Sequence, residues 1–257
     1  MRTPTDILYS LYEESLVRSL DRSRLPQHLG IVLDGHRRYA RDQGMPSYTD
    51  SYRAGMRRFE EFLGWSAALA IPAVTSWVLS RENLERPGEE LDPYFHVLIE
   101  LFERLPALAE PQDMSIRFIG SLDVLPDELV RAAKAAEAAR PTGNRRLNIA
   151  MGYGGRQEIV DAAKDLVADL ARRGVTAEEM SGQIDAVSLA RHMYSADVPD
   201  PDLLIRTSGE SRLSGFLLWQ SAYAEFVFVD VYWPAFRRVD FLRAIRDFSQ
   251  RDRRFGK

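Results

Sequence analysis

Short, continuous apolar runs alternate along this chain with longer segments of helical periodicity, and this alternation constrains the fold most. A continuous apolar run is typical of a parallel strand that is covered on both faces. Strands are therefore expected at His28–Leu33, Ala73–Leu79, Ser115–Ile119, Leu147–Met151, Leu203–Arg206 and Phe226–Val229.

The intervening segments have the composition and length of helices. Helices are expected at Ser51–Ala70, Asp92–Leu105, Asp127–Ala139 and Arg156–Arg173. Strands that alternate with helices predict an α/β fold, a doubly wound sheet of about six mostly parallel strands flanked by helices. No Pro/Gly/Ser-rich linker divides the chain, so we expect an N-terminal helical extension over residues 1–24 and a single domain over residues 25–257.

The charge balance narrows the class of partner. The net charge is −4 over 257 residues, which argues against a nucleic-acid-binding surface and makes any arginine cluster a local feature. The absence of cysteine excludes disulfides, thiolate catalysis and cysteine-based zinc sites.

The chain carries no pattern typical of a membrane or secreted protein. Residues 1–10 lack the basic-then-apolar order of a secretory signal. The longest uncharged stretch, residues 62–80, contains Pro72 and polar residues and falls short of the roughly 20 apolar residues of a spanning helix. A cytoplasmic location is expected.

Charged residues follow two of the predicted strands at the edge where open α/β sheets bind ligands. The first segment is Asp34-Gly35-His36-Arg37-Arg38. Its glycine permits a tight turn, and the next residues can open a helix whose free N–H groups face an anion. Asp34 would hold Mg²⁺ and Arg38 would neutralise phosphate. A helix-capping aspartate with solvated arginines is the alternative for this segment.

The second segment runs from Arg206 to Ser214 and holds two arginines and three serines around Gly209. This composition favours an anion-binding loop over a polar surface loop held by Arg–Glu ion pairs. Glu225, eleven residues beyond Ser214, is a second acid that can bind Mg²⁺. Together the two segments predict a diphosphate site.

Three further features are weaker. Gly152–Arg156 resembles a dinucleotide fingerprint, but Gln157 stands where the third glycine should be, so a tight turn is the better interpretation. Arg81, Asn83 and Arg86 follow the second strand and either reach the ligand or begin a helix. The four histidines lack metal-ligand spacing, and His36 alone occupies a candidate site.

Several of these segments, taken in order, resemble the cis-prenyltransferases (Z-isoprenyl diphosphate synthases, the undecaprenyl diphosphate synthase family). The resemblance extends from about Leu25 to Gly256 and is carried by His28–Tyr39, Ser80–Asn83, Asn148–Arg156, Asp202–Glu210, Phe216–Glu225 and Arg251–Gly256. The chain is most similar to short-chain, actinobacterial-type Z-farnesyl diphosphate synthases.

The resemblance implies roles for the residues that stand at its motif positions. Asp34 would bind Mg²⁺ at the allylic diphosphate, and Glu225 would complete the metal site. His36 would take a catalytic position beside Asp34. The residues implied in substrate binding are Gly35, Arg37, Arg38, Tyr39, Arg81, Asn83 and Arg86, with Arg206, Arg212 and Ser214 for isopentenyl diphosphate. Members of the family are typically homodimers, and the ending Arg254-Phe255-Gly256 would approach the partner's site.

The implied activity is Mg²⁺-dependent cis-condensation of isopentenyl diphosphate with a short allylic diphosphate. A product of about C15 to C20 is expected, because bulky residues would fill the tunnel that receives the prenyl chain. The residues expected to close it are Trp77, Val78 and Leu79 at the end of the second strand and, in the helix Asp92–Leu105, Tyr94, Phe95, Leu98, Leu101 and Phe102. Truncation of Val78 or Phe95 is expected to lengthen the product. A lipid product would also bring peripheral contact with a membrane.

The sequence departs from the family pattern at several positions. His36 stands where the family usually has Asn, Tyr39 where it has Trp, and Arg81 where it has Ser, while Tyr48 and Tyr52 replace basic residues. Nearby diphosphates are expected to raise the pKa of His36 toward the cationic form. Two roles stay open for this residue: an acid–base group, or a hydrogen-bonding group that replaces the amide of Asn. Two alternative functions therefore stay open: an irregular coupling that gives a branched or cyclised product, and a non-catalytic partner subunit.

Overall fold

One parallel β-sheet organises the molecule. The computed structural model describes residues 4–251, although the side chains of residues 4–8 and 10 are not described. Within this range six strands form the sheet in the order β3-β4-β2-β1-β5-β6, and every pair is parallel. The strands are β1 (His28–Val32), β2 (Ala73–Ser80), β3 (Met114–Ile119), β4 (Arg145–Tyr153), β5 (Leu203–Arg206) and β6 (Glu225–Phe228).

The strand predictions are confirmed, with small changes at the ends. β4 is longer than predicted, because Arg145 and Arg146 pair with β3 before the apolar run begins. β1 and β5 are buried along their whole length, as continuous apolar runs should be. The predicted α/β class with about six parallel strands is correct.

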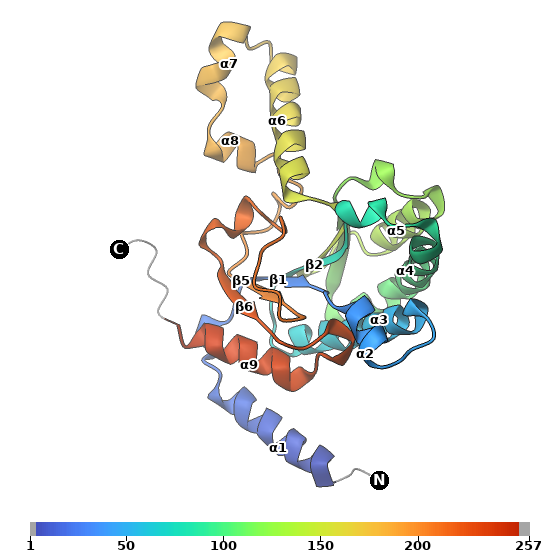
Figure 1. Cartoon of the computed structure of the whole chain (residues 1–257). Coiled ribbons are helices and arrows are strands. Elements are labelled where there is room, and N and C mark those ends of the chain that lie inside the picture. Colours follow the sequence, from blue (N-terminus) through green and yellow to red (C-terminus); the bar gives the residue numbers. More distant parts are fainter. Residues whose placement is uncertain (1–3, 252–257) are drawn as a thin grey trace.

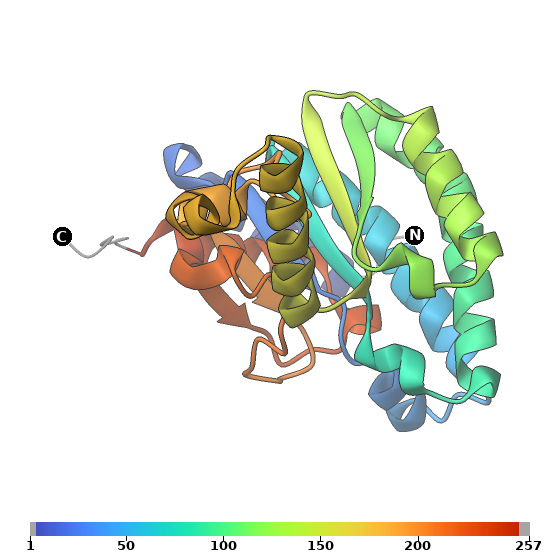
Figure 2. The same ribbon diagram turned by 90° about the horizontal axis from the view of Figure 1, so that it is seen from above.

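Helices cover both faces of the sheet (Figures 1 and 2). They are α1 (Pro4–Ser19), α2 (His36–Asp42), α3 (Tyr48–Ala68), α4 (Gly88–Ala109), α5 (Asp127–Ala139), α6 (Gly155–Arg172), α7 (Ala177–Gln183), α8 (Ala186–Ala190) and α9 (Arg238–Ser249). α3 begins three residues before the predicted start, because the Ser47 side chain caps it by accepting a hydrogen bond from the Thr49 N–H.

The two faces carry cores of different size. The larger core joins the sheet to α3, α4, α5 and α9 and contains Phe59, Phe62 and Phe102, all fully buried. The smaller core on the other face is built around Trp77 and Phe216. Their rings stack with centroids 5.2 Å apart. The site described below lies where β1, β2 and β5 end.

The N-terminal helix α1 lies along α9 (Figure 1). Leu16 and Leu20 are buried in the larger core, and Glu13 pairs with Arg238 at 3.2 Å. These contacts hold α1 to the sheet domain. No helix in the described part of the chain is long and apolar enough to cross a membrane.

Candidate active site

Asp34 and Arg206 meet at the carboxyl edge of the sheet. The register between β1 and β5 places Val32 beside Arg206, so the residues that follow β1 lie next to the Arg206 side chain. Arg206 Nη2 donates to Asp34 Oδ2 at 2.8 Å. Its Nη1 donates to Ser214 Oγ at 2.8 Å and to the backbone carbonyl of Arg212. Arg206, which is itself buried, thus fixes both the aspartate and the loop that follows β5.

Arg38 approaches Asp34 from α2. Its Nη2 lies 3.2 Å from Asp34 Oδ1 and donates to Ser208 Oγ at 2.7 Å. Its Nη1 donates to Glu210 Oε1 at 2.8 Å, and Glu210 also pairs with Arg212. Each carboxylate oxygen of Asp34 therefore faces one guanidinium group.

These arginines keep Asp34 ionised. Burial alone would raise the pKa of Asp34, but the hydrogen bond from Arg206 and the charges of Arg206 and Arg38 outweigh it and lower the pKa below its usual value. Asp34 is consequently an anion at neutral pH. Its side chain keeps 29% of its surface exposed, so it remains accessible to a ligand.

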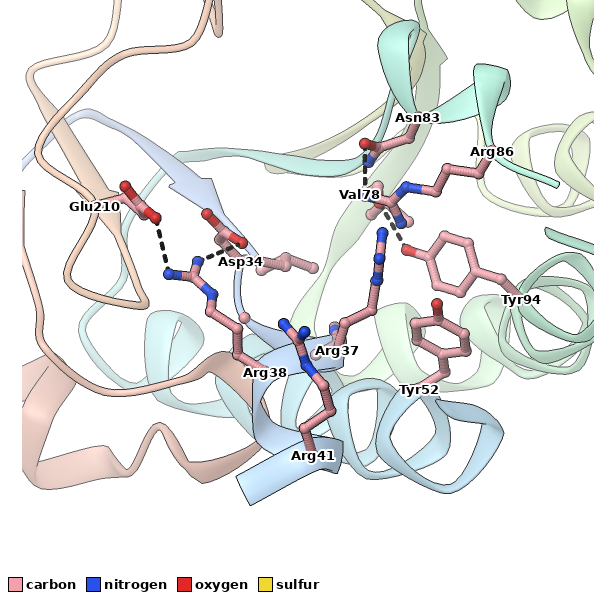
Figure 3. Close-up of a pocket in the computed structure, with 13 residues that line it drawn as sticks. Asp34, Arg37, Arg38, Arg41, Tyr52, Val78, Asn83, Arg86, Tyr94 and Glu210 are labelled. Carbon is pink, nitrogen blue, oxygen red and sulfur yellow. Dashed lines mark hydrogen bonds and ion pairs between the residues drawn. The ribbon is translucent and has the colours of Figure 1, made fainter. Parts of the chain in front are cut away.

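Two cavities adjoin at Asp34. The first cavity, of about 300 Å³, is lined by Leu33, Asp34, Gly35, His36, Arg37, Arg38, Arg41, Tyr52, Val78, Asn83, Arg86, Tyr94 and Glu210 (Figure 3). The second cavity, of about 400 Å³, is lined by Val32, Leu33, Asp34, Trp77, Val78, Ser80, Glu82, Asn83, Arg86, Arg206 and Ser214. Because both cavities share Asp34 and Arg86, two anionic ligands could lie side by side with these residues between them.

Arg86 is held in place between the two cavities. Its guanidinium donates to Asn83 Oδ1 at 2.7 Å and pairs with Glu90 at 3.2 Å. Arg37 reaches the same Glu90 carboxylate at 3.3 Å. Glu90 therefore links α2 to the segment after β2 through two arginines that line the first cavity.

His36 is a buried, neutral imidazole in the wall of the first cavity. Its ring lies 5.7 Å from that of Tyr52 and 6.5 Å from that of Tyr94, measured between centroids. Burial lowers the pKa of His36 to about 4, because it outweighs the attraction of Asp34. The raised pKa expected for an imidazole beside two bound diphosphates stays a prediction. Nε2 of His36 is buried and has no hydrogen-bond partner among the described residues.

Two tyrosines close the apolar end of the first cavity. The rings of Tyr52 and Tyr94 lie 4.5 Å apart, and Tyr94 Oη donates to the carbonyl of Val78 at 2.6 Å. Burial raises the pKa of the Tyr94 hydroxyl, so the group remains a donor. On the face of the sheet that α3 and α4 cover, the core is filled by side chains that are at most 1% exposed: Met56, Phe59, Leu98, Leu101 and Phe102. Of the residues expected to close the tunnel, Val78 and Tyr94 line this cavity, whereas Phe95 does not.

Four of the predicted site residues lie outside the two cavities. Tyr39 lines neither cavity, and Arg81 instead donates to Ser121 Oγ at 2.9 Å. Arg212 is largely exposed and contributes its backbone carbonyl to Arg206. Glu225 pairs with Leu203 at the start of β6, so it lies at the amino edge of the sheet, where it contacts Arg251.

A metal site would consequently depend on Asp34 and on the ligand. The structure does not bring Glu225 to Asp34, and no group of three His, Cys, Asp or Glu residues in the described range can hold a metal ion. Mg²⁺ is commonly bound by one or two carboxylates together with phosphate oxygens. A single ionised aspartate between two cavities fits that mode of binding. The ending Arg254-Phe255-Gly256 lies outside the described residues.

Sequence reasoning missed several residues of the site. Glu210 lay in the predicted loop, but nothing in the sequence showed that its carboxylate joins Arg38 to Arg212. Tyr52 comes from α3, where helical periodicity predicts burial but not which buried residues face a cavity. Tyr94 belonged to the bulky set expected to close the tunnel, but the sequence did not distinguish it from Phe95. Glu90 gave no signal beyond a charge in the first turn of a helix.

Comparisons with known proteins agree with this geometry. Residues 32–256 match a family model described as putative undecaprenyl diphosphate synthase. The chain is 48% identical to an isoprenyl transferase of Thermus thermophilus over 97% of this chain and 96% of that protein. It is 46% identical to a (2Z,6E)-farnesyl diphosphate synthase of Thermobifida fusca over 97% of each chain.

A solved structure is also similar along nearly the whole chain. It is a lavandulyl diphosphate synthase from Lavandula x intermedia in complex with dimethylallyl diphosphate. The two proteins are 30% identical, with a TM-score of 0.85, over 91% of this chain and 100% of that one.

Proposed function

This chain belongs to the undecaprenyl diphosphate synthase family of prenyltransferases, and we propose that it condenses isopentenyl diphosphate with a short allylic diphosphate in the cis configuration. The observation that carries the proposal is the pair of adjoining cavities, each lined by arginines and both bordered by Asp34. A reaction that joins two diphosphate esters needs two such anion sites next to each other.

Each cavity suits one of the two substrates. The first cavity combines Arg37, Arg38 and Arg86 with an aromatic end, which suits the diphosphate and prenyl group of the allylic substrate. The second cavity, with Arg206 and Ser214, would take isopentenyl diphosphate. In the reaction the allylic carbon–oxygen bond breaks, a carbon–carbon bond forms to isopentenyl diphosphate, and that unit loses a proton. The arginines stabilise the negative charge that develops on the leaving diphosphate.

Asp34 would hold Mg²⁺ together with diphosphate oxygens. The ion would supply further stabilisation of the leaving group's charge. The chain's own contribution is to keep Asp34 ionised and oriented, which the ion pairs with Arg38 and Arg206 accomplish. His36 is neutral and buried, so its contribution would be its place in the wall of the first cavity.

We expect a product of about C15 to C20. The close packing of Tyr52 against Tyr94 supports a short product. A longer prenyl chain would have to pass between two rings whose centroids are 4.5 Å apart. The hydrogen bond from Tyr94 to Val78 also closes the route between α4 and β2. A homodimer in the cytoplasm, in peripheral contact with a membrane through its lipid product, completes the proposal.

An irregular coupling is the second candidate. It is favoured by the similarity to a lavandulyl diphosphate synthase and by His36 in the wall of the first cavity. Its product would be branched or cyclised rather than linear. A non-catalytic partner subunit is disfavoured, because Asp34, Arg38 and Arg206 form a connected set of ion pairs at the two cavities.

One incubation tests these alternatives. The purified protein is mixed with labelled isopentenyl diphosphate and C5, C10 or C15 allylic diphosphates, with Mg²⁺ or with a chelator, and the dephosphorylated products are separated by chromatography. Linear Z-prenyl alcohols of C15 to C20 that require Mg²⁺ are expected. Branched or cyclic alcohols would favour the irregular coupling, and no product from any primer would refute the enzymatic proposal.

A further inference from the structure

One arginine of the first cavity differs from the others in its pairing. Arg37 and Arg86 share the carboxylate of Glu90, and Arg38 pairs with Asp34 and Glu210. Arg41 also lines this cavity but forms no ion pair with any carboxylate whose side chain the structure describes. Its charge is therefore available to a ligand.

The position of Arg41 on α2 directs it to the same ligand as its neighbours. It follows Arg37 by four residues and Arg38 by three, so all three side chains leave one face of the helix. Figure 3 shows the Arg41 side chain extending from α2 toward the cavity, in the same direction as Arg37. Arg41 comes from the last turn of α2 and is exposed, so it lies toward the solvent side of the cavity.

The charges of the two cavities show what Arg41 adds. The first cavity is lined by four arginines and by Asp34 and Glu210, and Glu90 neutralises part of this charge from outside the lining. Four arginines thus face three carboxylates, and one positive charge is left over. The second cavity is lined by two acids, Asp34 and Glu82, and two arginines, so it has no excess.

We propose that Arg41 binds the outer phosphate of the diphosphate in the first cavity. The other arginines must share or exchange a carboxylate when a diphosphate arrives, whereas Arg41 can form a charge-assisted hydrogen bond without losing a partner. It would therefore contribute to the affinity for the first substrate and not for the second. The identity of that first substrate as the allylic diphosphate rests on the function proposed above.

The test compares Arg41→Gln with Arg53→Gln. Arg53 is a matched control, because its half-exposed side chain pairs with Glu100 and lines neither cavity. Titration calorimetry in the presence of Mg²⁺ measures the binding of a thiolodiphosphate analogue of dimethylallyl diphosphate. The carbon–sulfur bond of this analogue resists the cleavage that begins the reaction. Steady-state kinetics then give KM for each substrate, and thermal melting by circular dichroism checks that the variants are folded.

Arg41→Gln is expected to weaken analogue binding about tenfold and to raise KM for the allylic substrate similarly, with less than a twofold change for isopentenyl diphosphate. Arg41→Lys should retain part of the affinity, and Arg53→Gln should match the native protein. Unchanged analogue binding, or an equal rise in both KM values, would overturn the proposal. If the native protein binds the analogue but forms no product, the proposed function fails while the role of Arg41 is still decided by the calorimetry.

Discussion

Replacing Gly55 by alanine is expected to displace His36 within the first cavity. A Cβ at Gly55 in α3 would lie 2.4 Å from Nε2 of His36, where an ordinary contact begins at 3.4 Å, so the imidazole or the helix must move by about 1 Å. The helix is held at this point, because Trp233 Nε1 donates to the Gly55 carbonyl at 2.8 Å. The ring is also confined by Tyr52 and Tyr94.

Gly64 supplies the reference for the size of the effect. It lies in the same helix, and a Cβ there would meet no atom within 4 Å. Gly64→Ala should therefore raise the free energy of unfolding by roughly 0.5–1 kcal/mol through helix propensity. Gly55→Ala should gain the same helix propensity but also pay for overpacking, which typically costs about 1–3 kcal/mol. Its free energy of unfolding should therefore lie about 1–3 kcal/mol below that of Gly64→Ala.

Urea unfolding and steady-state kinetics would measure both consequences. Because a displacement of about 1 Å at a reacting centre can cost on the order of 100-fold in rate, kcat of Gly55→Ala should fall by about 10- to 100-fold, while Gly64→Ala stays near native. Adding His36→Ala to Gly55→Ala should recover the lost stability, because it removes the clashing ring. If Gly55→Ala and Gly64→Ala have the same stability and the same kcat, the inferred contact between Gly55 and His36 is wrong.

Three further substitutions test other parts of the site. Asp34→Ala should lower turnover with Mg²⁺ by about 100-fold or more, and near-native turnover would contradict the metal assignment. Tyr94→Ala should lengthen the products seen by chromatography, whereas Phe95→Ala, a control from the same helix, should not; equal products from both would remove Tyr94 as the stop. The pKa of His36 is about 6.5 in the unfolded chain and is lowered to about 4 in the folded protein. As the pH falls below 6.5 the unfolded chain therefore takes up a proton before the folded protein does. The contribution of neutral His36 to the free energy of unfolding is complete above pH 6.5 and is lost as the pH falls toward 4. His36→Asn should remove this part of the pH dependence in urea unfolding, and the same pH dependence as the native protein would contradict burial of the ring.

The sequence predicted the sheet well because parallel strands leave a strong local pattern. The run Ala73–Leu79 became β2, Ala73–Ser80, and the run Leu203–Arg206 became β5 without change. The meeting of Asp34 and Arg206 followed from the same pattern, because both residues stand at the carboxyl ends of predicted strands.

The position of Glu225 could have been predicted from the same rule. Asp34 and Arg206 stand at the carboxyl ends of their strands, whereas Glu225 precedes the apolar run Phe226–Val229, so it had to lie at the opposite edge of the sheet. Within one chain the strand order therefore separates Glu225 from Asp34, and the role of Glu225 in the metal site stays a prediction.

Other features depend on tertiary packing and left no signal in the sequence. The pKa of His36 is set by how deeply α3 and α4 bury the ring, which a single residue type does not reveal. The hydrogen bond from Tyr94 to the Val78 carbonyl depends on how α4 packs against β2. The free charge of Arg41 likewise depends on which carboxylates the fold gives to its neighbours.

Two diphosphates are expected to bind side by side with Asp34 between them. A crystal structure with Mg²⁺, isopentenyl diphosphate and the thiolodiphosphate analogue of dimethylallyl diphosphate tests it most directly. We expect the analogue's diphosphate beside Arg37, Arg38 and Arg86, and the second diphosphate beside Arg206 and Ser214. Density for both diphosphates in one cavity, or for either one away from Asp34, would contradict it.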